Sequence, residues 1–307
     1  MPDALPAALV EAIRAKLGSR ARPGALLARH TSFRIGGPAD LLVLPDTAAD
    51  LAHVLRTATA FGVRVTLLGG GSNMLVGDGG MRGVVVKLGR GFGTIDWEGA
   101  PVVRAGAAVQ LGRLAREAVA RGLAGLEYAE GIPGTVGGAL FMNAGAYGGE
   151  VSGAVQAVEG IDPATGTPTE IGAPALAFTY RRSALPPGFV VTAVRFHLRR
   201  EVVEGVRERM DGARTRRIAA QPHGHANAGS IFKNPCGHHA GRLIDEAGLK
   251  GARAGRARIS ERHANFIVNE GGARAAEVKA LMDLAQRVVW ERSGVWLEPE
   301  VQLVGTW

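Results

Sequence analysis

This sequence has few of the features that mark secreted or membrane proteins. Its 307 residues include a single cysteine, Cys236, so no internal disulfide can form, and this cysteine usage is typical of the reducing cytoplasm. No stretch approaches the roughly 20 uncharged apolar residues that a membrane-spanning helix requires. The first residues, Met1 to Ala4, lack the charged-then-apolar pattern of a signal peptide. We therefore expect a cytoplasmic protein with no membrane partner.

Aromatic residues are also scarce, at 5% of the chain, which disfavours a platform on which single-stranded nucleic acid could stack. The net charge of +8, from 36 basic and 28 acidic residues, is mostly scattered along the chain. One basic group falls on an expected helix, where a solvated face is the usual explanation: Arg207, Arg209, Arg214, Arg216 and Arg217. The charge therefore predicts attraction for anionic small molecules and no nucleic-acid partner.

Glycine, by contrast, is abundant, and its densest stretch runs from Gly131 to Gly149. Glycine loses more backbone entropy on ordering than any other residue, so we expect no ordinary helix or strand here. Glycines permit close backbone approach and leave peptide N–H groups available to an anion. The alternative is a flexible surface loop. Five residues are too apolar for a solvated loop: Ile132, Val136, Leu140, Phe141 and Met142. We predict a buried wall against which a flat or phosphorylated ligand lies.

A second glycine-rich loop, Gly69 to Gly80, follows an expected strand, as a phosphate-binding loop should. It lacks the Gly-Lys-Ser/Thr of the triphosphate loop, and Met74 stands where the dinucleotide fingerprint needs a third glycine. Ser72 and Asn73 add side-chain donors suited to a pyrophosphate. A plain turn is the alternative.

Hydrophobic periodicity predicts alternating helices and strands. Helices are expected at 5–17, 47–61, 110–121, 201–219, 240–248 and 274–290. Strands are expected at 41–44, 63–68, 84–88, 102–105, 155–161, 190–198, near 258 and 266, and at 297–304, with a turn at 162–166. The pattern changes near residue 200, where we place a domain boundary, and the last strand is expected to return to an earlier domain.

Three short segments carry side chains that could do chemistry. Ser230 lies in the segment Gly229–Pro235, but without the glycine pattern of a hydrolase elbow. Arg181 is suited to a bidentate carboxylate clamp. Glu300 lies near the C-terminus, and a surface salt bridge explains the arginine and the glutamate equally well. The histidines 223, 225, 238 and 239 surround Cys236, which suggests zinc, but no second-shell carboxylate is evident, so we expect no metal.

Taken in order, these motifs resemble the UDP-N-acetylenolpyruvoylglucosamine reductase (MurB) family. The resemblance rests on the segments 31–39, 68–73, 131–139, 143–148, 180–181, 229–235 and 300–301, and it runs from about residue 28 to the end. It implies an α+β chain with an FAD-binding fold of the vanillyl-alcohol-oxidase (PCMH) type in two subdomains. The expected domains are FAD-binding subdomain 1 at 1–93 with a return at 296–307, subdomain 2 at 94–200, and an α+β substrate-binding domain at 201–295.

The resemblance also implies the site residues. The catalytic residues would be Arg181, Ser230 and Glu300. The residues around non-covalent FAD would be Gly69, Gly70, Gly71, Ser72, Asn73, Gly131, Ile132, Pro133, Gly134, Thr135, Gly137, Gly138, Asn143 and Ala144. Those that bind the substrate would be Tyr147, Tyr180, Lys233 and Asn234. Only 49 positions separate Arg181 from Ser230 (230 − 181), too few for an added tyrosine-bearing flap, so the shorter (type II) subclass is expected.

The implied reaction is NADPH-dependent reduction of the enolpyruvyl group of UDP-N-acetylenolpyruvoylglucosamine to UDP-N-acetylmuramate, in bacterial peptidoglycan precursor synthesis. Arg181 would hold the enediolate, a protonated Glu300 would hydrogen-bond to it, and Ser230 would supply the proton.

The alternatives are another FAD-dependent oxidoreductase of this fold that acts on a sugar or alcohol, and a basic binding protein without flavin. Gln302 and the segment 226–228 depart from the family pattern. A monomer is expected, although the sequence does not determine the oligomeric state.

Overall fold

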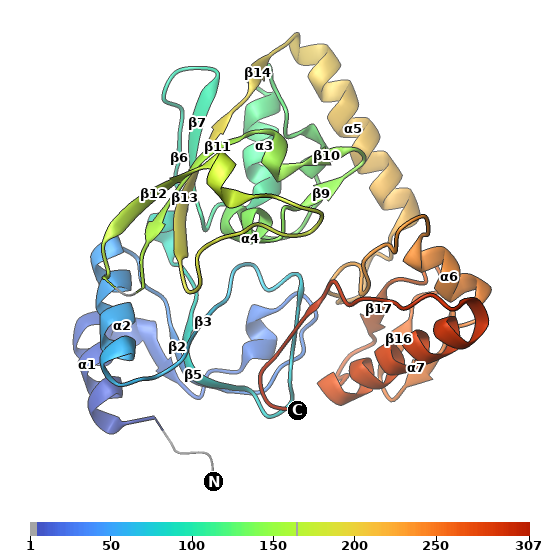
Figure 1. Cartoon of the computed structure of the whole chain (residues 1–307), viewed down its shortest axis with the longest axis horizontal. Helices are drawn as coiled ribbons and strands as arrows, with labels where there is room; N and C mark the ends of the chain where they lie inside the picture. Colours follow the sequence, from blue (N-terminus) through green and yellow to red (C-terminus); the bar gives the residue numbers. More distant parts are fainter. Residues whose placement is uncertain (1–4, 164) are drawn as a thin grey trace. The chain divides into compact units, whose positions relative to one another are not determined.

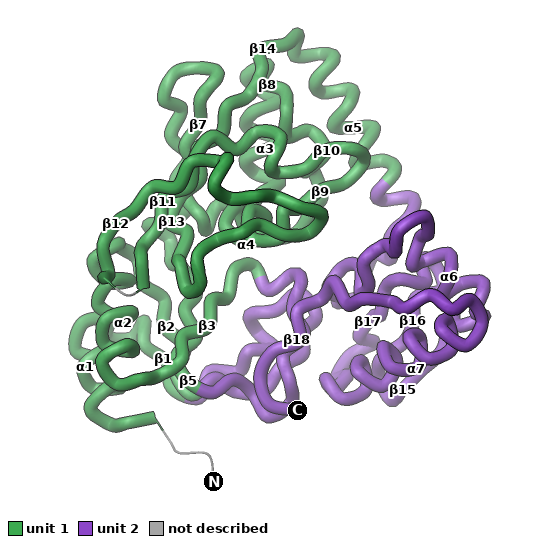
Figure 2. The backbone as a smooth tube through the Cα atoms, in the orientation of Figure 1, with its two compact units in different colours: residues 1–23, 40–70, 83–216 green, residues 24–39, 71–82, 217–307 purple. Residues whose placement is uncertain are grey.

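The computed structural model describes residues 5–163 and 165–307. Met1 to Ala4, which lack a signal-peptide pattern, and Ala164 of the expected turn lie outside the described residues. The chain divides into two compact units (Figure 2). Unit 1 comprises residues 1–23, 40–70 and 83–216, and unit 2 comprises residues 24–39, 71–82 and 217–307. Across the described residues, no helix combines the length and the apolar character that crossing a membrane requires.

A small mixed sheet lies in the N-terminal part of the chain, in the strand order β1-β2-β5-β3 (Figure 1). Its strands are β1 (Ala21–Pro23), β2 (Ala39–Val43), β5 (Met81–Val86) and β3 (Val65–Leu67). The helices α1 (Ala7–Leu17) and α2 (Ala48–Ala60) contribute the apolar side chains of the same core. The side chain of Thr47 accepts a hydrogen bond from the Asp50 amide, which starts α2 as the sequence predicts.

The core of unit 1 is a five-stranded antiparallel sheet in the order β12-β11-β13-β7-β6. These strands are β6 (Ile95–Asp96), β7 (Val102–Gly106), β11 (Val155–Ile161), β12 (Pro168–Gly172) and β13 (Val190–His197). Helices α3 (Leu111–Val119) and α4 (Val136–Phe141) pack on one face, where a continuous buried cluster includes Val103, Leu114, Leu140, Val158 and Phe196. Two short pairs, β9 (Gly145–Ala146) with β10 (Gly149–Glu150) and β8 (Leu123–Ala124) with β14 (Arg199–Arg200), complete the strands of this unit.

Helix α5 (Val203–Ala220) continues from unit 1 into unit 2. Unit 2 contains the sheet β15 (Arg253–Ala254), β16 (Ala257–Ile259) and β17 (Ile267–Asn269), with helices α6 (Ala240–Glu246) and α7 (Ala275–Ser293). The C-terminal strand β18 (Gln302–Val304) pairs in parallel with β4 (Met74–Val76), inside the segment that the sequence presents as a loop. This strand pair joins residues more than 200 positions apart, and β4 is an element that the sequence analysis misses.

The glycine-rich stretch 131–149 differs from its prediction in two respects. It does contain a helix and strands, α4, β9 and β10, because the face of α4 that carries Val136, Ala139 and Leu140 is buried against the sheet and offsets the entropic cost of its glycines. It is also only partly buried. Phe141 is 52% exposed, because it lies on the opposite side of this short helix.

Candidate active site

The two glycine loops approach each other closely within unit 1. A side chain added at Gly70 would place its Cβ 2.8 Å from the Cα of Gly134, and one added at Gly69 would come within 3.1 Å of the Thr135 hydroxyl. Because real Cβ atoms do not approach a backbone this closely, Gly70 cannot carry a side chain without displacing the other loop. The two loops therefore pack backbone against backbone, a contact that the glycines make possible.

Backbone hydrogen bonds fix the second of these loops in place. The amides of Val136 and Gly137 donate to the carbonyls of Val109 and Ala107 at 2.8 and 3.0 Å, and the carbonyl of Gly134 accepts from the Leu111 amide at 3.0 Å. Gly131 and Gly134 adopt positive φ angles of 79° and 119°, which favour glycine. Ile132, Pro133, Gly138 and Ala144 belong to the same ordered stretch, at the positions expected for cofactor contacts.

The loop after β3 passes from one unit to the other. Gly69 and Gly70 belong to unit 1, whereas Gly71, Ser72 and Asn73 belong to unit 2. Gly71 has a φ of 64°, and a Cβ there would lie only 2.3 Å from the carbonyl oxygen of His30. The carbonyl of Gly71 accepts a hydrogen bond from the Ser32 amide at 3.0 Å. This part of the loop is therefore held by the segment around residues 30–32.

Arg181 lies in a tight turn of unit 1. Thr179 and Arg182 exchange two backbone hydrogen bonds, of 3.0 and 3.1 Å, around the central pair Tyr180 and Arg181. Arg181 has a positive φ of 59°, an unusual backbone conformation for a residue with a side chain. Its guanidinium lies 4.8 Å from the ring centroid of Tyr180, which is 46% exposed. Tyr147, the other tyrosine expected at the substrate, is similarly exposed, and the guanidinium of Arg216 lies 4.9 Å from its ring.

Ser230 and Glu300 are neighbours in unit 2. Phe232 forms an antiparallel bridge with Pro299. The amide of Glu300 donates to the carbonyl of Ile231 at 2.8 Å, and the amide of Lys233 donates to the carbonyl of Glu298 at 2.9 Å. This ladder brings the backbone of the segment 230–233 beside that of 298–301, so the segments that carry Ser230 and Glu300, 70 positions apart (300 − 230), lie side by side. Both are partly buried. Arg181 belongs to the other unit.

Sequence reasoning missed the residue that fixes this ladder, Asn265, whose side chain is 3% exposed. Its Oδ1 accepts from the Phe232 amide at 2.9 Å and its Nδ2 donates to the Phe232 carbonyl at 2.8 Å. Its own carbonyl accepts from the Ile231 amide at 2.9 Å. The only signal in the sequence is one amide side chain within the apolar run Ala264 to Val268, which does not reveal the partner.

The two other expected substrate residues already have protein partners. The ammonium of Lys233 contacts the carboxylate of Glu298 at 2.5 Å. Asn234 is exposed, and its Oδ1 accepts from the Ala240 amide at the start of α6, with 3.0 Å between N and O. A substrate group that binds Lys233 would therefore have to compete with Glu298.

A pocket of about 390 Å³ lies beside Ser230 in unit 2. Its lining residues are Ser230, Asn234, His239, Gly241, Arg242, Asp245, Lys250, Arg262, His263, Ala264 and Asn265. Three of these are cationic and one is a carboxylate, so the pocket suits an anionic group. Burial lowers the pKa of His263, and the nearby charge of Lys250 lowers it further. Its Nδ1 accepts a hydrogen bond from the Asn265 amide at 3.2 Å, which fits a neutral imidazole.

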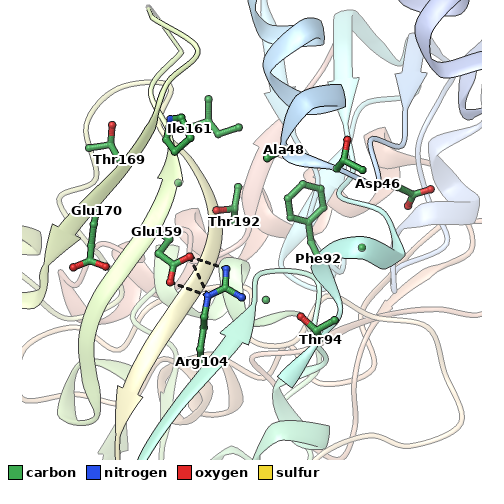
Figure 3. A pocket seen from close by; sticks show the side chains of 15 residues that line it. Asp46, Ala48, Phe92, Thr94, Arg104, Glu159, Ile161, Thr169, Glu170 and Thr192 are labelled. Carbon is green, nitrogen blue, oxygen red and sulfur yellow. Dashed lines mark hydrogen bonds and ion pairs between the residues drawn. The ribbon is translucent and has the colours of Figure 1, made fainter. Parts of the chain in front are cut away.

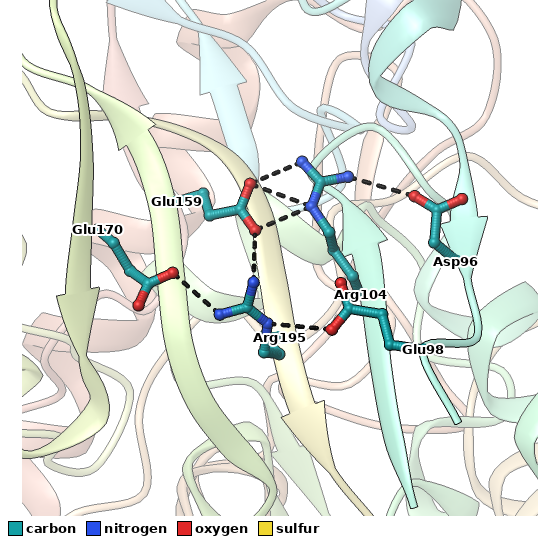
Figure 4. Close-up of polar contacts among 6 residues, drawn as sticks. All are labelled: Asp96, Glu98, Arg104, Glu159, Glu170 and Arg195. Carbon is teal, nitrogen blue, oxygen red and sulfur yellow. Dashed lines mark hydrogen bonds and ion pairs between the residues drawn. The ribbon is translucent and has the colours of Figure 1, made fainter. Parts of the chain in front are cut away.

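A second pocket, of about 760 Å³, lies in unit 1 and is lined by residues that include Thr47, Phe92, Arg104, Glu159 and Thr192 (Figure 3). None of its lining residues belongs to the glycine motifs. Three of its charged residues, Arg104, Glu159 and Glu170, belong to an ion-pair network across the five-stranded sheet (Figure 4). Arg104 pairs with Glu159 at 2.6 Å and with Asp96 at 3.3 Å, and Arg195 pairs with Glu170 at 2.9 Å. Because the network links neighbouring strands, we assign it to the stability of the sheet.

The histidines around Cys236 do not assemble a metal site. Cys236 is exposed, and the His223 ring is hydrogen-bonded to the carbonyl of Ile218 at 3.0 Å. Within 5–163 and 165–307, no group of three His, Cys, Asp or Glu side chains is arranged to hold a metal ion.

Comparisons with known proteins place this architecture in a family. Residues 39–172 match the model of an FAD binding domain, and residues 221–304 match the C-terminal domain of UDP-N-acetylenolpyruvoylglucosamine reductase. The reductase of Azorhizobium caulinodans is 43% identical over 99% of this chain and 97% of its own length, and that of Geobacter sulfurreducens is 44% identical over 99% of both.

The crystal structure of the reductase (MurB) from Thermus caldophilus superposes with a TM-score of 0.80 and 42% identity, covering 91% of this chain and 97% of that one. The FAD-binding fold expected from the motifs is therefore confirmed, together with the mixed helix and strand content. With both matched domains present and relatives aligned over nearly its whole length, this chain belongs to the UDP-N-acetylenolpyruvoylglucosamine reductase (MurB) family.

Proposed function

We propose that this chain reduces the enolpyruvyl group of UDP-N-acetylenolpyruvoylglucosamine to give UDP-N-acetylmuramate, a step in bacterial peptidoglycan precursor synthesis. The observation that carries the proposal is the ladder that brings the segment of Ser230 beside that of Glu300, in a chain whose family acts on this substrate. An oxidoreductase of the same fold acting on a simple sugar or alcohol would not need this pair.

The two glycine loops support an FAD site. They pack backbone against backbone at Gly69, Gly70, Gly134 and Thr135, and bare glycine backbone leaves peptide N–H groups available to a pyrophosphate. We propose that these residues, the rest of the stretch 131–144, and Gly71, Ser72 and Asn73 hold FAD non-covalently. Bound FAD would accept a hydride from NADPH and deliver it to the terminal vinyl carbon of the substrate.

The residues of this chain then have distinct roles at the substrate. Hydride addition drives negative charge from the vinyl group into the adjacent carboxylate, which becomes an enediolate. We propose that Arg181 holds this carboxylate, because a fixed cation stabilises charge most where it develops in the transition state. Glu300, in its protonated form, would donate a hydrogen bond to the same group. The hydroxyl of Ser230 would give its proton to the carbon that bears the carboxylate, which completes the reduction.

The basic pocket beside Ser230 supports a site for the substrate diphosphate. Arg242, Lys250 and Arg262 line it with Asn234, and Lys233 follows Ser230 by three positions. We assign Tyr147 and Tyr180, both exposed, to substrate contacts as well.

NADPH and UDP-sugars are small anions of the cytoplasm, where we place the reaction, and the net charge of +8 would attract them. We propose a monomer with three domains, at 1–93 with 296–307, 94–200 and 201–295.

The segment between Arg181 and Ser230 contains β13, β14 and α5, and no tyrosine. This supports the shorter subclass, in which the third domain itself would close over the substrate and exclude water.

An anaerobic two-step titration tests the function. The purified protein should be yellow, NADPH should bleach the flavin, and UDP-N-acetylenolpyruvoylglucosamine should restore its colour. A colourless protein that does not take up added FAD would contradict the flavin assignment. A flavin that is bleached but reoxidised only by oxygen would favour another oxidoreductase of this fold.

A further inference from the structure

The side chain of Asn143 is fully engaged with other parts of unit 1. It is 1% exposed, and its backbone has a positive φ of 40°. Its Nδ2 donates to the carbonyl of Thr179 at 3.1 Å and to the carboxylate of Glu150 at 2.9 Å, while its Oδ1 accepts from the Ser152 amide at 3.0 Å. Both amide hydrogens of Nδ2 are therefore used within the protein.

The bond to Thr179 holds one end of the turn that carries Arg181. The other end is held by Ser183, which is 7% exposed. Its amide and its hydroxyl both donate to the carbonyl of Phe141, at 3.2 and 3.0 Å. The turn is thus attached at both ends to residues 141–143, at the C-terminal end of α4.

Attachment at both ends matters because the turn is strained. Arg181 occupies the left-handed region of backbone space, where a side chain is disfavoured. Such a conformation persists only when the surrounding structure holds it in place. The reciprocal bonds between Thr179 and Arg182 close the turn but do not fix its position on the body of unit 1. That position depends on Asn143 and Ser183.

We propose that Asn143 and Ser183 are positioning residues that hold the guanidinium of Arg181 where the substrate carboxylate binds. This inference rests on the proposed function for the role of Arg181. Asn143 acts through its amide, which links the flavin-side wall to the turn. An aspartate at 143 keeps the acceptor for Ser152 and tolerates the positive φ, but it removes the donor to Thr179 and faces Glu150 with a second carboxylate.

Limited trypsin digestion tests the attachment without any activity assay. The bonds after Arg181 and Arg182 should be cut at least threefold faster in Asn143→Asp than in the parent, as followed by mass spectrometry. The matched control is Asn269→Asp, because Asn269 is another buried asparagine, whose Nδ2 donates to the carbonyl of Phe33 at 2.9 Å in unit 2. The control should leave cleavage at 181 and 182 unchanged. Equal rates in Asn143→Asp and the parent would overturn the proposal.

The kinetic test uses a double-mutant cycle on the FAD-loaded enzyme. In Asn143→Asp that is fully loaded with FAD and reduced, reoxidation by the enolpyruvyl nucleotide should fall about 30-fold or more relative to the parent. In an Arg181→Ala background the same change should cost less than twofold, because a residue that acts through Arg181 has nothing left to position. Equal losses in both backgrounds would overturn the proposal.

If Asn143→Asp does not fold, Ser183→Ala takes its place in both tests. This variant keeps the backbone bond to Phe141 and removes only the hydroxyl bond, with threefold effects expected in the same directions. No change in either test would overturn the proposal. A parent enzyme whose reduced flavin does not react with the nucleotide would refute the proposed function, whereas the digestion would still decide the attachment.

Discussion

The side-chain amide of Asn73 donates a hydrogen bond to the backbone carbonyl of Glu300, with 3.0 Å between nitrogen and oxygen. The amide of Gln302 in turn donates to the carbonyl of Asn73 at 2.9 Å. Asn73 comes from the glycine loop after β3, and Glu300 lies two residues before the first residue of β18, which pairs with β4. The residue expected to bind FAD therefore also fixes the backbone at the residue expected to bind the enediolate.

We expect Asn73→Ala to slow reoxidation of the reduced flavin by the nucleotide about fivefold. The lost hydrogen bond is worth on the order of 1 kcal/mol, and 1.4 kcal/mol corresponds to a factor of ten in rate. The matched control is Gln302→Ala, because the Gln302 side chain donates to the same carbonyl at a longer 3.3 Å and is exposed. It should cost less than about threefold. Stopped-flow absorbance of the flavin measures both rates. If the variant loses FAD but its flavin is reoxidised at the parent rate once FAD has been added back, Asn73 contributes to cofactor binding and not to the position of Glu300.

Parts of this architecture could be predicted from the sequence because they depend on local patterns. The bounds of β11 are those expected from its alternation, and α2 begins after Thr47 as its capping pattern indicates. The strand β4 could not be predicted, because it forms only by pairing with β18, far along the chain. The glycine content of residues 136–141 argues against the helix α4. The burial of its apolar face, which offsets that cost, depends on the tertiary structure and cannot be predicted from the local sequence.

The residues of the candidate site also divide into those that the sequence identifies and those that only the structure reveals. The resemblance singles out Ser230 and Glu300, and the ladder through Phe232 and Pro299 brings them together. The bonds by which Asn265 supports the ladder and Asn143 supports the turn leave no pattern in the sequence, because each joins a side-chain amide to the backbone of a distant segment. Such partners carry no signature in residue type. Gln302, which departs from the family pattern, donates to the carbonyl of Glu300.

Ser230→Ala should separate the two half-reactions. Bleaching of the flavin by NADPH should be nearly unchanged, whereas reduction of the substrate should fall about 10²–10⁴-fold, the typical contribution of a general acid. The physical reason is that the proton is needed only after hydride reaches the substrate. Single-turnover kinetics of each half-reaction measure the two rates separately. Equal damage to the two half-reactions would point to a role in folding or flavin binding instead.

Lys233 and Glu298 should have opposite effects on substrate binding. Lys233→Met removes a cation from the expected diphosphate site, so we expect the KM for the nucleotide to rise several-fold and to depend less on salt, because screening acts on the lost charge. Glu298→Gln frees the ammonium of Lys233 from its 2.5 Å partner, so the same KM should fall. Steady-state kinetics at low and high ionic strength distinguish these outcomes. An unchanged KM in both variants would remove Lys233 from the substrate site.

Glu159→Gln should destabilise unit 1. The hydrogen bond from Arg104 lowers the pKa of Glu159, although partial burial opposes the shift. Because the folded-state pKa lies below the ordinary value of 4.5, the carboxylate stabilises the fold above that pH and ceases to do so as pH falls through the folded pKa. At pH 7 we expect the free energy of unfolding to fall by about 1.5–3 kcal/mol, the range for hydrogen bonds to charged groups.

Urea unfolding of the parent and Glu159→Gln at several pH values measures this contribution, and the difference should shrink below pH 4.5. The matched control is Glu170→Gln, on the neighbouring strand of the same network, where the side chain is 55% exposed and should contribute less than about 1 kcal/mol. A loss for Glu170→Gln as large as that for Glu159→Gln would contradict the assignment of Glu159 as the centre of the network.

His263 should make the stability of unit 2 sensitive to mildly acidic pH. Burial, helped by Lys250, lowers its pKa below the ordinary value of 6.5. The unfolded chain therefore takes up a proton near pH 6.5 before the folded chain does, so the stabilisation from the neutral ring is present above pH 6.5 and is lost as pH falls toward the folded pKa. The groups packed around the ring agree with a neutral form, since the Asn265 amide donates to Nδ1 and Phe266 contacts its edge at 4.9 Å between centroids.

His263→Gln removes the titrating group but keeps an acceptor for the Asn265 amide. We expect the parent to lose up to about 1.4 kcal/mol of unfolding free energy per pH unit below 6.5 from this residue, and the variant to lack that part of the slope. Denaturant unfolding at pH 7.5, 6.5 and 5.5 measures the difference. The control is His197→Gln on the exposed side of β13, which removes an imidazole that is not buried. Parallel pH profiles for the parent and His263→Gln would show that the imidazole titrates alike in the folded and unfolded chain, and the pocket beside Ser230 would then be open to water.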